Sequence, residues 1–201
     1  MIIKENGLFY FLIHGDFTPV CTTEIIAFTR AHTYFKQINT ELLGLSIDSN
    51  ASHLAWIYDI YCRTGVQISF PIIADRSGEI ARKYGMIASD ISNTETVRNV
   101  FIIDDNGIVR TILVYPMNVG RFIPEILRII QALQMSDCTQ GSTAANWIPN
   151  QPVIVPPPKT FCELQERQQE ITKNRNGINW YLSFKEPSQK CINKGTSLCD
   201  E

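Results

Sequence analysis

The chain has 201 residues, of which 44% are hydrophobic and 19% charged, and its formal net charge at pH 7 is -2. This length and apolar content suit one compact domain, or one domain with an appendage. The charge balance provides neither the basic patch that binds nucleic acid nor a cluster of lysines and arginines that would hold an anionic membrane surface. The longest early apolar run, Leu8 to Ile13, is too short for a transmembrane helix or for the core of a signal peptide, so we expect a cytoplasmic protein.

Apolar, β-branched runs alternate with helical patterns through the first two thirds of the chain. The first expected elements are strand 8–13, helix 20–38 and strand 43–47, followed by a helix that is capped by 48–50 and ends at Tyr61 or Thr64. Strand 70–74 and helix 78–84 come next. Strands 97–103 and 108–115 then flank the turn sequence Asp104-Asp105-Asn106-Gly107, and the last helix lies at about 123–134. Such a succession indicates an α/β or α+β fold with a central mixed sheet.

The composition changes after Met135. Residues 136–160 are rich in Ser, Thr, Asn, Gln and Pro, and they include Pro156-Pro157-Pro158. This composition predicts an extended arm rather than a second core, although Trp147 and the run 153–155 are apolar enough to pack against something. We therefore divide the chain into a globular domain at 1–135 and an arm at 136–201.

The segment around Cys21 carries the clearest chemical signal. Thr18 is a favourable N-cap and Pro19 a favourable first helical residue, so Cys21 falls at the third position of the helix. Free backbone N–H groups and the positive end of the helix dipole favour an anion there, and the thiolate is the reactive form of cysteine. A cysteine near a helix start is, however, often inert packing, so this segment by itself leaves both interpretations open.

Thr18-x-x-Cys21 within DFTPVCTTE resembles the active-site motif of the peroxiredoxin family. Further blocks resemble the same family in the same order: 48–49 with 53–57, FPIIAD (70–75), RNVFIIDDNGIVR (98–110), YPMNVGRFIPEILRIIQALQ (115–134) and NWIPNQPVIVPPP (146–158). The last block resembles the C-terminal dimerisation arm of the branch that includes the one-cysteine-type and archaeal enzymes. The likeness covers nearly the whole chain.

The resemblance implies a thioredoxin fold, with helices flanking its central sheet, and the reduction of hydrogen peroxide or small alkyl hydroperoxides in antioxidant defence. It identifies Cys21 as the peroxidatic cysteine, which becomes a sulfenic acid, and Thr18 as the hydroxyl that hydrogen-bonds the thiolate and the peroxide. Arg98 matches the arginine that stabilises the thiolate and the charge that develops as the O–O bond breaks. A guanidinium suits this role because it is always charged and presents a fixed fork of donors.

Three further residues have more than one interpretation. Glu24 matches a family glutamate that orients such an arginine, but it could be a solvated acid that complements the helix dipole. Arg121 matches a second family arginine near the site, but it could be a surface cation before a helix. His14 either corresponds to the family's histidine or replaces the proline that shields the cysteine.

The six cysteines include no C-x-x-C pair, which argues against a zinc ribbon and a thioredoxin-type dithiol site. In the cytosol we expect all of them to be thiols. Where related enzymes have a cysteine near the C-terminus, this chain has Ser183. Cys191 and Cys199, on a polar tail, are the candidate resolving residues, and uninvolved tail thiols are the alternative. Cys62 and Cys138 match no motif.

The resemblance implies no metal, flavin or haem, an external thiol or dithiol such as thioredoxin as the electron donor, and a homodimer or higher oligomer. Family members carry a strand hairpin before the strand corresponding to 8–13, and this chain begins without it. Together with position 14, that difference motivates an alternative function as a non-turnover redox sensor or chaperone-like oligomer. A thioredoxin-like disulfide reductase is a weaker alternative because the C-x-x-C pair is absent.

Overall fold

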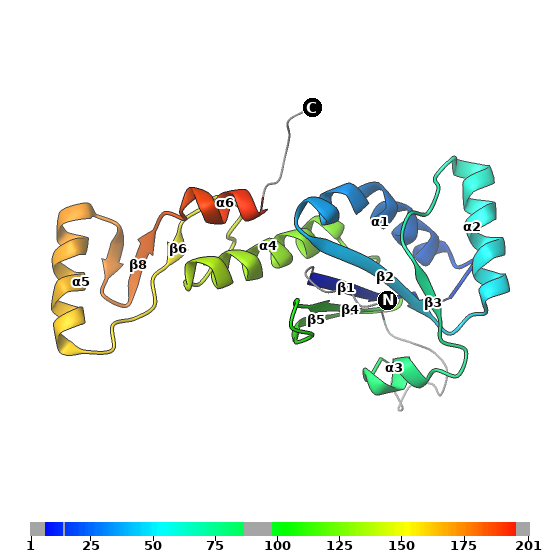
Figure 1. Cartoon of the computed structure of the whole chain (residues 1–201), viewed down its shortest axis with the longest axis horizontal. Coiled ribbons are helices and arrows are strands. Elements are labelled where there is room, and N and C mark those ends of the chain that lie inside the picture. Colours follow the sequence, from blue (N-terminus) through cyan, green and yellow to red (C-terminus); the bar gives the residue numbers. More distant parts are fainter. Residues whose placement is uncertain (1–6, 14, 87–97, 196–201) are drawn as a thin grey trace. The chain divides into compact units, whose positions relative to one another are not determined.

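The computed structural model describes residues 7–13, 15–86 and 98–195, and the chain divides into two compact units, Met1–Ile123 and Pro124–Glu201. Figure 1 shows the elements of each unit. The first unit contains β1 (Gly7–Leu12), α1 (Pro19–Gln37), β2 (Thr40–Ser46), α2 (Asn50–Thr64), β3 (Ile72–Ala74), α3 (Glu79–Lys83), β4 (Arg98–Ile103) and β5 (Val109–Tyr115).

The five strands of the first unit form one mixed sheet in the order β3-β2-β1-β4-β5. β1 pairs in parallel with β2 and β2 in parallel with β3, whereas β1–β4 and β4–β5 are antiparallel. Helices α1 and α2 make the two parallel crossovers, as parallel pairs require. The predicted central mixed sheet is therefore confirmed, with β1 in its middle.

Side chains cover both faces of β4, since all its residues are buried. Phe101 and Ile103 point to one face, where they pack with Leu45 of β2, with Ala81 of α3 and with Met86 just beyond α3. Because side chains alternate along a strand, Arg98, Val100 and Ile102 point to the other face. A strand in this position is normally an uninterrupted apolar run, so the buried Arg98 at its first position requires a special environment.

The local signals for helix and turn boundaries are confirmed. Ser49 caps α2, because its side chain accepts a hydrogen bond from the Ser52 N–H at 3.2 Å, and the helix ends at Gly65 with a left-handed φ of 71°. The β4–β5 hairpin turns at Gly107, whose φ is 79°. These boundaries depend on residues near one another in the sequence, which is why the sequence predicts them to within a few positions.

The second unit differs from the predicted arm. It contains most of α4 (Ile123–Thr139), then β6 (Val153–Ile154), α5 (Phe161–Asn174), β7 (Gly177–Asn179), β8 (Leu182–Lys185) and α6 (Gln189–Gly195), with a three-stranded sheet in the order β6-β8-β7. Met135, Trp147, Val153 and Cys191 form a small core of its own. The prediction of an extended arm without a second core is therefore wrong.

The predicted end of the last helix near Gln134 is displaced, because helix α4 continues to Thr139. The compact units divide at 123/124, and the division into a peroxide-reducing domain and an arm at 135/136 stays a prediction. The polar residues after Met135 suggest a loop, but they include no helix breaker until Gly141. The Thr139 hydroxyl donates to the Met135 carbonyl at 2.7 Å within the last turn. Polar composition here marks a change in exposure rather than the end of the helix.

A disulfide joins Cys138 to Cys191 within the second unit. The expectation that all cysteines are thiols is therefore wrong for this pair. Cys191 lies on α6 with 7% of its surface exposed, not on a free polar tail. Within the described residues Cys21, Cys62 and Cys162 are free, and Cys199 lies outside them. No helix of the described part of the chain combines the length and apolarity needed to span a bilayer.

His32 makes the stability of the first unit depend on pH. This residue of α1 is buried, and its Nδ1 lies 2.6 Å from the Oγ of Ser69. The pKa of His32 is lowered from 6.5, mainly because burial disfavours the charged ring. Nearby Lys36 lowers this pKa further, and Glu41 partly offsets the effect.

As the pH falls below about 6.5, His32 gains a proton in the unfolded chain before it does so in the folded chain. Its contribution to the free energy of unfolding is thus complete above about pH 6.5 and decreases below it, by at most about 1.4 kcal/mol per pH unit. Urea unfolding of the wild type and of His32→Gln, from about pH 7.5 to about pH 5.5, measures this contribution. The variant should lose less stability on acidification, and equal losses would contradict the prediction.

Candidate active site

The first turn of α1 presents Cys21 as predicted, but Thr18 contributes differently. Thr18 has the extended backbone of an N-cap (φ -91°, ψ 143°), and Pro19 is the first helical residue. The Thr18 side chain does not cap the helix, because its hydroxyl donates to the carbonyl of Gly15 at 2.8 Å. The Thr18 carbonyl accepts two hydrogen bonds from Thr22, from its N–H at 3.0 Å and from its hydroxyl at 2.8 Å. Hydrogen bonds on both sides therefore fix the turn.

The sulfur of Cys21 contacts a guanidinium. Cys21 is 2% exposed, and Nη1 of Arg98 donates to its Sγ at 3.1 Å. Arg98 is equally buried, at the first position of β4. A guanidinium and the positive end of α1 thus both lie next to the sulfur of Cys21.

Glu24 connects this pair to a second arginine. It lies one turn after Cys21 on α1 and is 4% exposed. Its Oε2 accepts from Nη1 of Arg98 at 2.9 Å and from Nη1 of Arg121 at 3.3 Å, while its Oε1 accepts from the Arg121 backbone N–H at 2.9 Å. One carboxylate thus binds two guanidiniums from different segments. Both surface interpretations, a solvated Glu24 and an exposed Arg121, are wrong.

Three charged side chains meet in this cluster. Arg98 and Arg121 carry two positive charges, and Glu24 binds both of them with its carboxylate. The pKa of Arg121 is lowered to about 10, mainly by burial and also by Arg98, while Glu24 and Cys21 oppose the shift. Arg121 therefore remains charged at neutral pH. The buried sulfur of Cys21 lies next to this group of charges, 3.1 Å from Nη1 of Arg98.

Two neighbours of the cluster have no signal in the sequence. Nε of Arg98 donates to the Met117 carbonyl at 2.7 Å, so the loop after β5 fixes the orientation of the guanidinium. Nε1 of Trp56, a fully buried residue of α2, donates to the Thr22 hydroxyl at 3.2 Å. A backbone acceptor cannot be identified from the sequence, and a tryptophan in a helix is predicted to be a core residue. Only the fold brings them to α1.

The loop before Thr18 is anchored to α2 and to the end of β2. Nδ1 of His53 lies 2.8 Å from a carboxylate oxygen of Asp16, and the Asp16 N–H donates to Asp48 at 2.8 Å. The pKa of Asp16 is raised, mainly by burial and also by the charge of Asp48, against opposing contributions from Ser52 and His53. The sequence predicts no role for Asp16 or His53. His14 lies outside the described residues.

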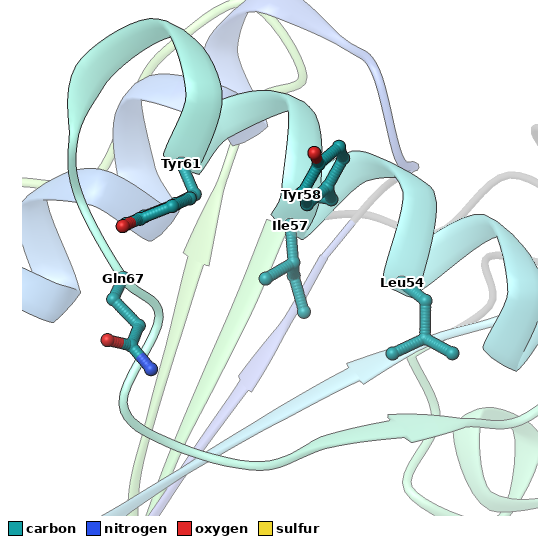
Figure 2. A pocket seen from close by; sticks show the side chains of 5 residues that line it. All are labelled: Leu54, Ile57, Tyr58, Tyr61 and Gln67. Atoms are coloured by element: carbon teal, nitrogen blue, oxygen red, sulfur yellow. The ribbon is translucent and has the colours of Figure 1, made fainter.

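The structure thus brings together four candidate residues, Cys21, Glu24, Arg98 and Arg121, next to Thr18. Among the described residues no group of three or more His, Cys, Asp and Glu could hold a metal ion. A separate pocket of about 450 Å³ is lined by Leu54, Ile57, Tyr58, Tyr61 and Gln67 (Figure 2). This lining has no charged side chain to activate a substrate, so the buried cluster around Cys21 is the candidate active site.

Comparisons with known proteins agree over most of the chain. A family model described as "AhpC/TSA family" matches residues 3–112, and one described as "C-terminal domain of 1-Cys peroxiredoxin" matches residues 132–170. Peroxiredoxin 2 of Caldanaerobacter subterraneus subsp. tengcongensis is 54% identical over 171 residues, which are 85% of this chain and 77% of that protein. The peroxiredoxin of Aquifex aeolicus is 45% identical over 192 residues, 90% of this chain and 85% of that protein.

Two solved structures are similar to almost the whole chain. A cysteine-to-serine mutant of peroxiredoxin 6 from Arenicola marina has a TM-score of 0.79 at 30% identity, covering 93% of this chain and 88% of that one. The yeast mitochondrial 1-Cys peroxiredoxin has a TM-score of 0.76 at 35% identity, covering 91% of this chain and 87% of that one.

The buried bridge at Glu24 predicts a large loss of stability when its charge is removed. Glu24→Gln leaves two buried guanidiniums without their carboxylate, which should lower the free energy of unfolding by about 3–5 kcal/mol. Glu125→Gln is the matched control, because Glu125 pairs with Arg128 at 2.6 Å while both side chains are partly exposed. The control should lose no more than about 1 kcal/mol. Similar losses in urea unfolding of the two variants would contradict the buried bridge.

Proposed function

Because this chain belongs to the AhpC/TSA family of peroxiredoxins, with the thioredoxin-like fold and thiol peroxidase activity of that family, we propose that Cys21 is its peroxidatic cysteine. The family membership, the fold and the peroxide-reducing activity expected from the sequence are thereby confirmed. The observation that carries the residue assignment is the 3.1 Å contact of Arg98 with the Cys21 sulfur inside a buried cluster that also holds Glu24 and Arg121.

In the proposed reaction the Cys21 thiolate attacks the terminal oxygen of the peroxide. An S–O bond forms as the O–O bond breaks, so the sulfur becomes a sulfenic acid and the peroxide leaves as water or an alcohol after gaining a proton. Negative charge moves from the sulfur to the departing oxygen. Arg98 is in place to stabilise both locations, since its guanidinium is already oriented by Glu24 and Met117 and need not reorganise during the step.

Arg98 also favours cleavage of the O–O bond. Its guanidinium is within hydrogen-bonding distance of the sulfur, so it can attract the departing hydroxide or alkoxide. The role proposed for Thr18 is smaller, because its proton is engaged by Gly15. Its oxygen retains lone pairs that can accept a hydrogen bond from a peroxide O–H.

The burial of Cys21 supports small substrates. A sulfur that is 2% exposed admits hydrogen peroxide or a small alkyl hydroperoxide more readily than a bulky one. We assign the protein to antioxidant defence in the cytoplasm on this chemistry and on the composition of the chain.

An external thiol or dithiol, such as thioredoxin, is the proposed reductant. The solved yeast 1-Cys peroxiredoxin is described with a thiol resolving mechanism that uses glutathione and thioredoxin systems. The sulfur of Cys191 is committed to Cys138 and cannot resolve Cys21 while that bond exists. Cys199 remains the internal alternative.

A homodimer, or a higher oligomer built from it, is the proposed assembly. The second unit exposes large apolar side chains, among them Phe161 at 74% and Ile178 at 76%. In the first unit β5 is an edge strand of the described sheet, with Ile112 and Val114 exposed. Unpaired edges and exposed apolar groups are the features that a second copy would cover.

Cys21→Ser should abolish peroxide consumption, because no other thiol has the same contact with a buried guanidinium in the described residues. Cys62→Ser, which removes an exposed free thiol, should retain wild-type turnover. The measurement is steady-state consumption of hydrogen peroxide with a dithiol donor. Many turnovers per Cys21 support the peroxidase, a single oxidation per chain supports the sensor alternative, and full activity in Cys21→Ser would refute the assignment.

Arg98→Met should lower the second-order rate constant with hydrogen peroxide by about 10²-fold, the typical cost of removing one preorganised donor to a developing negative charge. It should also move the pH profile of Cys21 alkylation to higher pH, since the positive charge that favours the thiolate is lost. Arg63→Met, which removes an exposed arginine paired with Asp59, is the control and should leave both quantities unchanged. An alkylation profile that stays in place in Arg98→Met would count against the role.

A further inference from the structure

We propose that Cys138 and Cys191 form a second redox site, distinct from Cys21, whose disulfide fastens the C-terminal unit and whose reduction loosens it. Cys138 lies in the last turn of α4 and Cys191 on α6, with their Cα atoms 5.8 Å apart and their sulfurs bonded. The two positions are separated by 53 residues in the sequence. The covalent loop therefore encloses β6, α5, β7 and β8 completely.

The second unit has a small apolar cluster around this bond. It consists of Met135, Trp147, Val153 and Cys191, with Ala132 and Cys138 packed against them. Helix α5 buries no side chain. Cys191 of α6 belongs to this cluster, so the disulfide joins α6 covalently to α4. Small units with few buried apolar residues commonly depend on a covalent cross-link.

The expected effect of the bond follows from loop closure. For a loop of 53 residues, restricting the unfolded chain favours the folded unit by about 10³-fold in the chain-entropy model. Non-covalent contacts that remain after reduction include the paired backbone bonds of Ser142 with Ile154 and the donation from Lys185 Nζ to the Thr139 carbonyl. Reduction should therefore loosen the segment enclosed by the bond before it affects the first unit.

This pair is chemically different from Cys21. The polar contact of Cys191 Sγ is the hydroxyl of Ser188 at 3.3 Å, a neutral donor, whereas Cys21 faces the guanidinium of Arg98. Among the described residues no guanidinium donates to the sulfur of Cys138 or Cys191, so these thiols should react with peroxide more slowly than Cys21. The bond should thus form when peroxide persists, after the faster Cys21 has been saturated.

Hydrogen peroxide, the substrate of the family, can serve as the oxidant that forms the Cys138–Cys191 bond. One thiolate of the pair attacks hydrogen peroxide, so that an S–O bond forms, the O–O bond breaks and hydroxide leaves to become water. The second thiolate then attacks the oxidised sulfur, the S–S bond forms, and the oxygen departs as a second water. Together the two thiols lose two electrons and two protons to the peroxide, and a dithiol reductant reverses the change by exchange.

Hydrogen exchange of the full chain tests the proposal without any mutation. Amides enclosed by the disulfide, from β6 to β8, should exchange at least about tenfold faster after treatment with dithiothreitol, while those of α1 and β4 stay unchanged. Cys62→Ser should behave like the wild type. The double variant Cys138→Ser, Cys191→Ser should exchange fast in both conditions. Exchange in the enclosed segment that does not respond to reduction in the wild type would overturn the proposal.

Re-oxidation distinguishes this site from the peroxidase. In reduced Cys21→Ser protein, hydrogen peroxide should restore the Cys138–Cys191 bond, detected as a mass loss of two hydrogens and as protection of both cysteines from alkylation. This result supports an independent site even if the role proposed for Cys21 is wrong. Free, alkylatable Cys138 and Cys191 after prolonged peroxide treatment would overturn the proposal. So would a bond that forms only when Cys21 is present.

Discussion

The buried carboxylate of Glu24 is the interaction on which the site depends. Two guanidiniums cannot lie side by side in the interior of a protein unless an anion separates their charges. Glu24 does so from α1, binding Arg98 of β4 and both the backbone and side chain of Arg121. The sulfur of Cys21 lies within hydrogen-bonding distance of the guanidinium that Glu24 holds in place.

This constraint explains several features of the first unit. Arg98 can be buried at the start of β4 because α1 crosses that face of the sheet and brings Glu24 and Cys21 to it together. The loop between β5 and α4 contributes the Met117 carbonyl and the Arg121 N–H, so its backbone is part of the site. The hydrogen bonds around Thr18 and Asp16 have the same effect on the other side, since they fix the turn from which the sulfur projects.

The sequence predicts features that depend on neighbouring residues, and it does not predict contacts between residues far apart in the chain. The helix start at Thr18-Pro19, the cap at Ser49 and the hairpin at Gly107 are local, and each was predicted from its own neighbours. Glu24 and Arg121 had two interpretations because their burial depends on segments far apart in sequence. The contacts of Trp56 and Met117 with the site could not be predicted, since a helical tryptophan indicates only a core residue and Met117 acts through its carbonyl. The compact second unit was missed for the same reason: its polar sequence suggests an arm, and the partner of Cys138 is a distant cysteine.

The position of Arg98 on an interior strand has a consequence for access to the sulfur of Cys21, which is 2% exposed. β4 is hydrogen-bonded to strands on both sides and buried on both faces, so the sheet holds the strand that carries Arg98. Cys21 is carried instead by the first turn of α1, which the hydrogen bonds of Thr18 with Gly15 and Thr22 hold in place. With the role proposed for Cys21, the entry of a reductant therefore depends on how readily that turn opens.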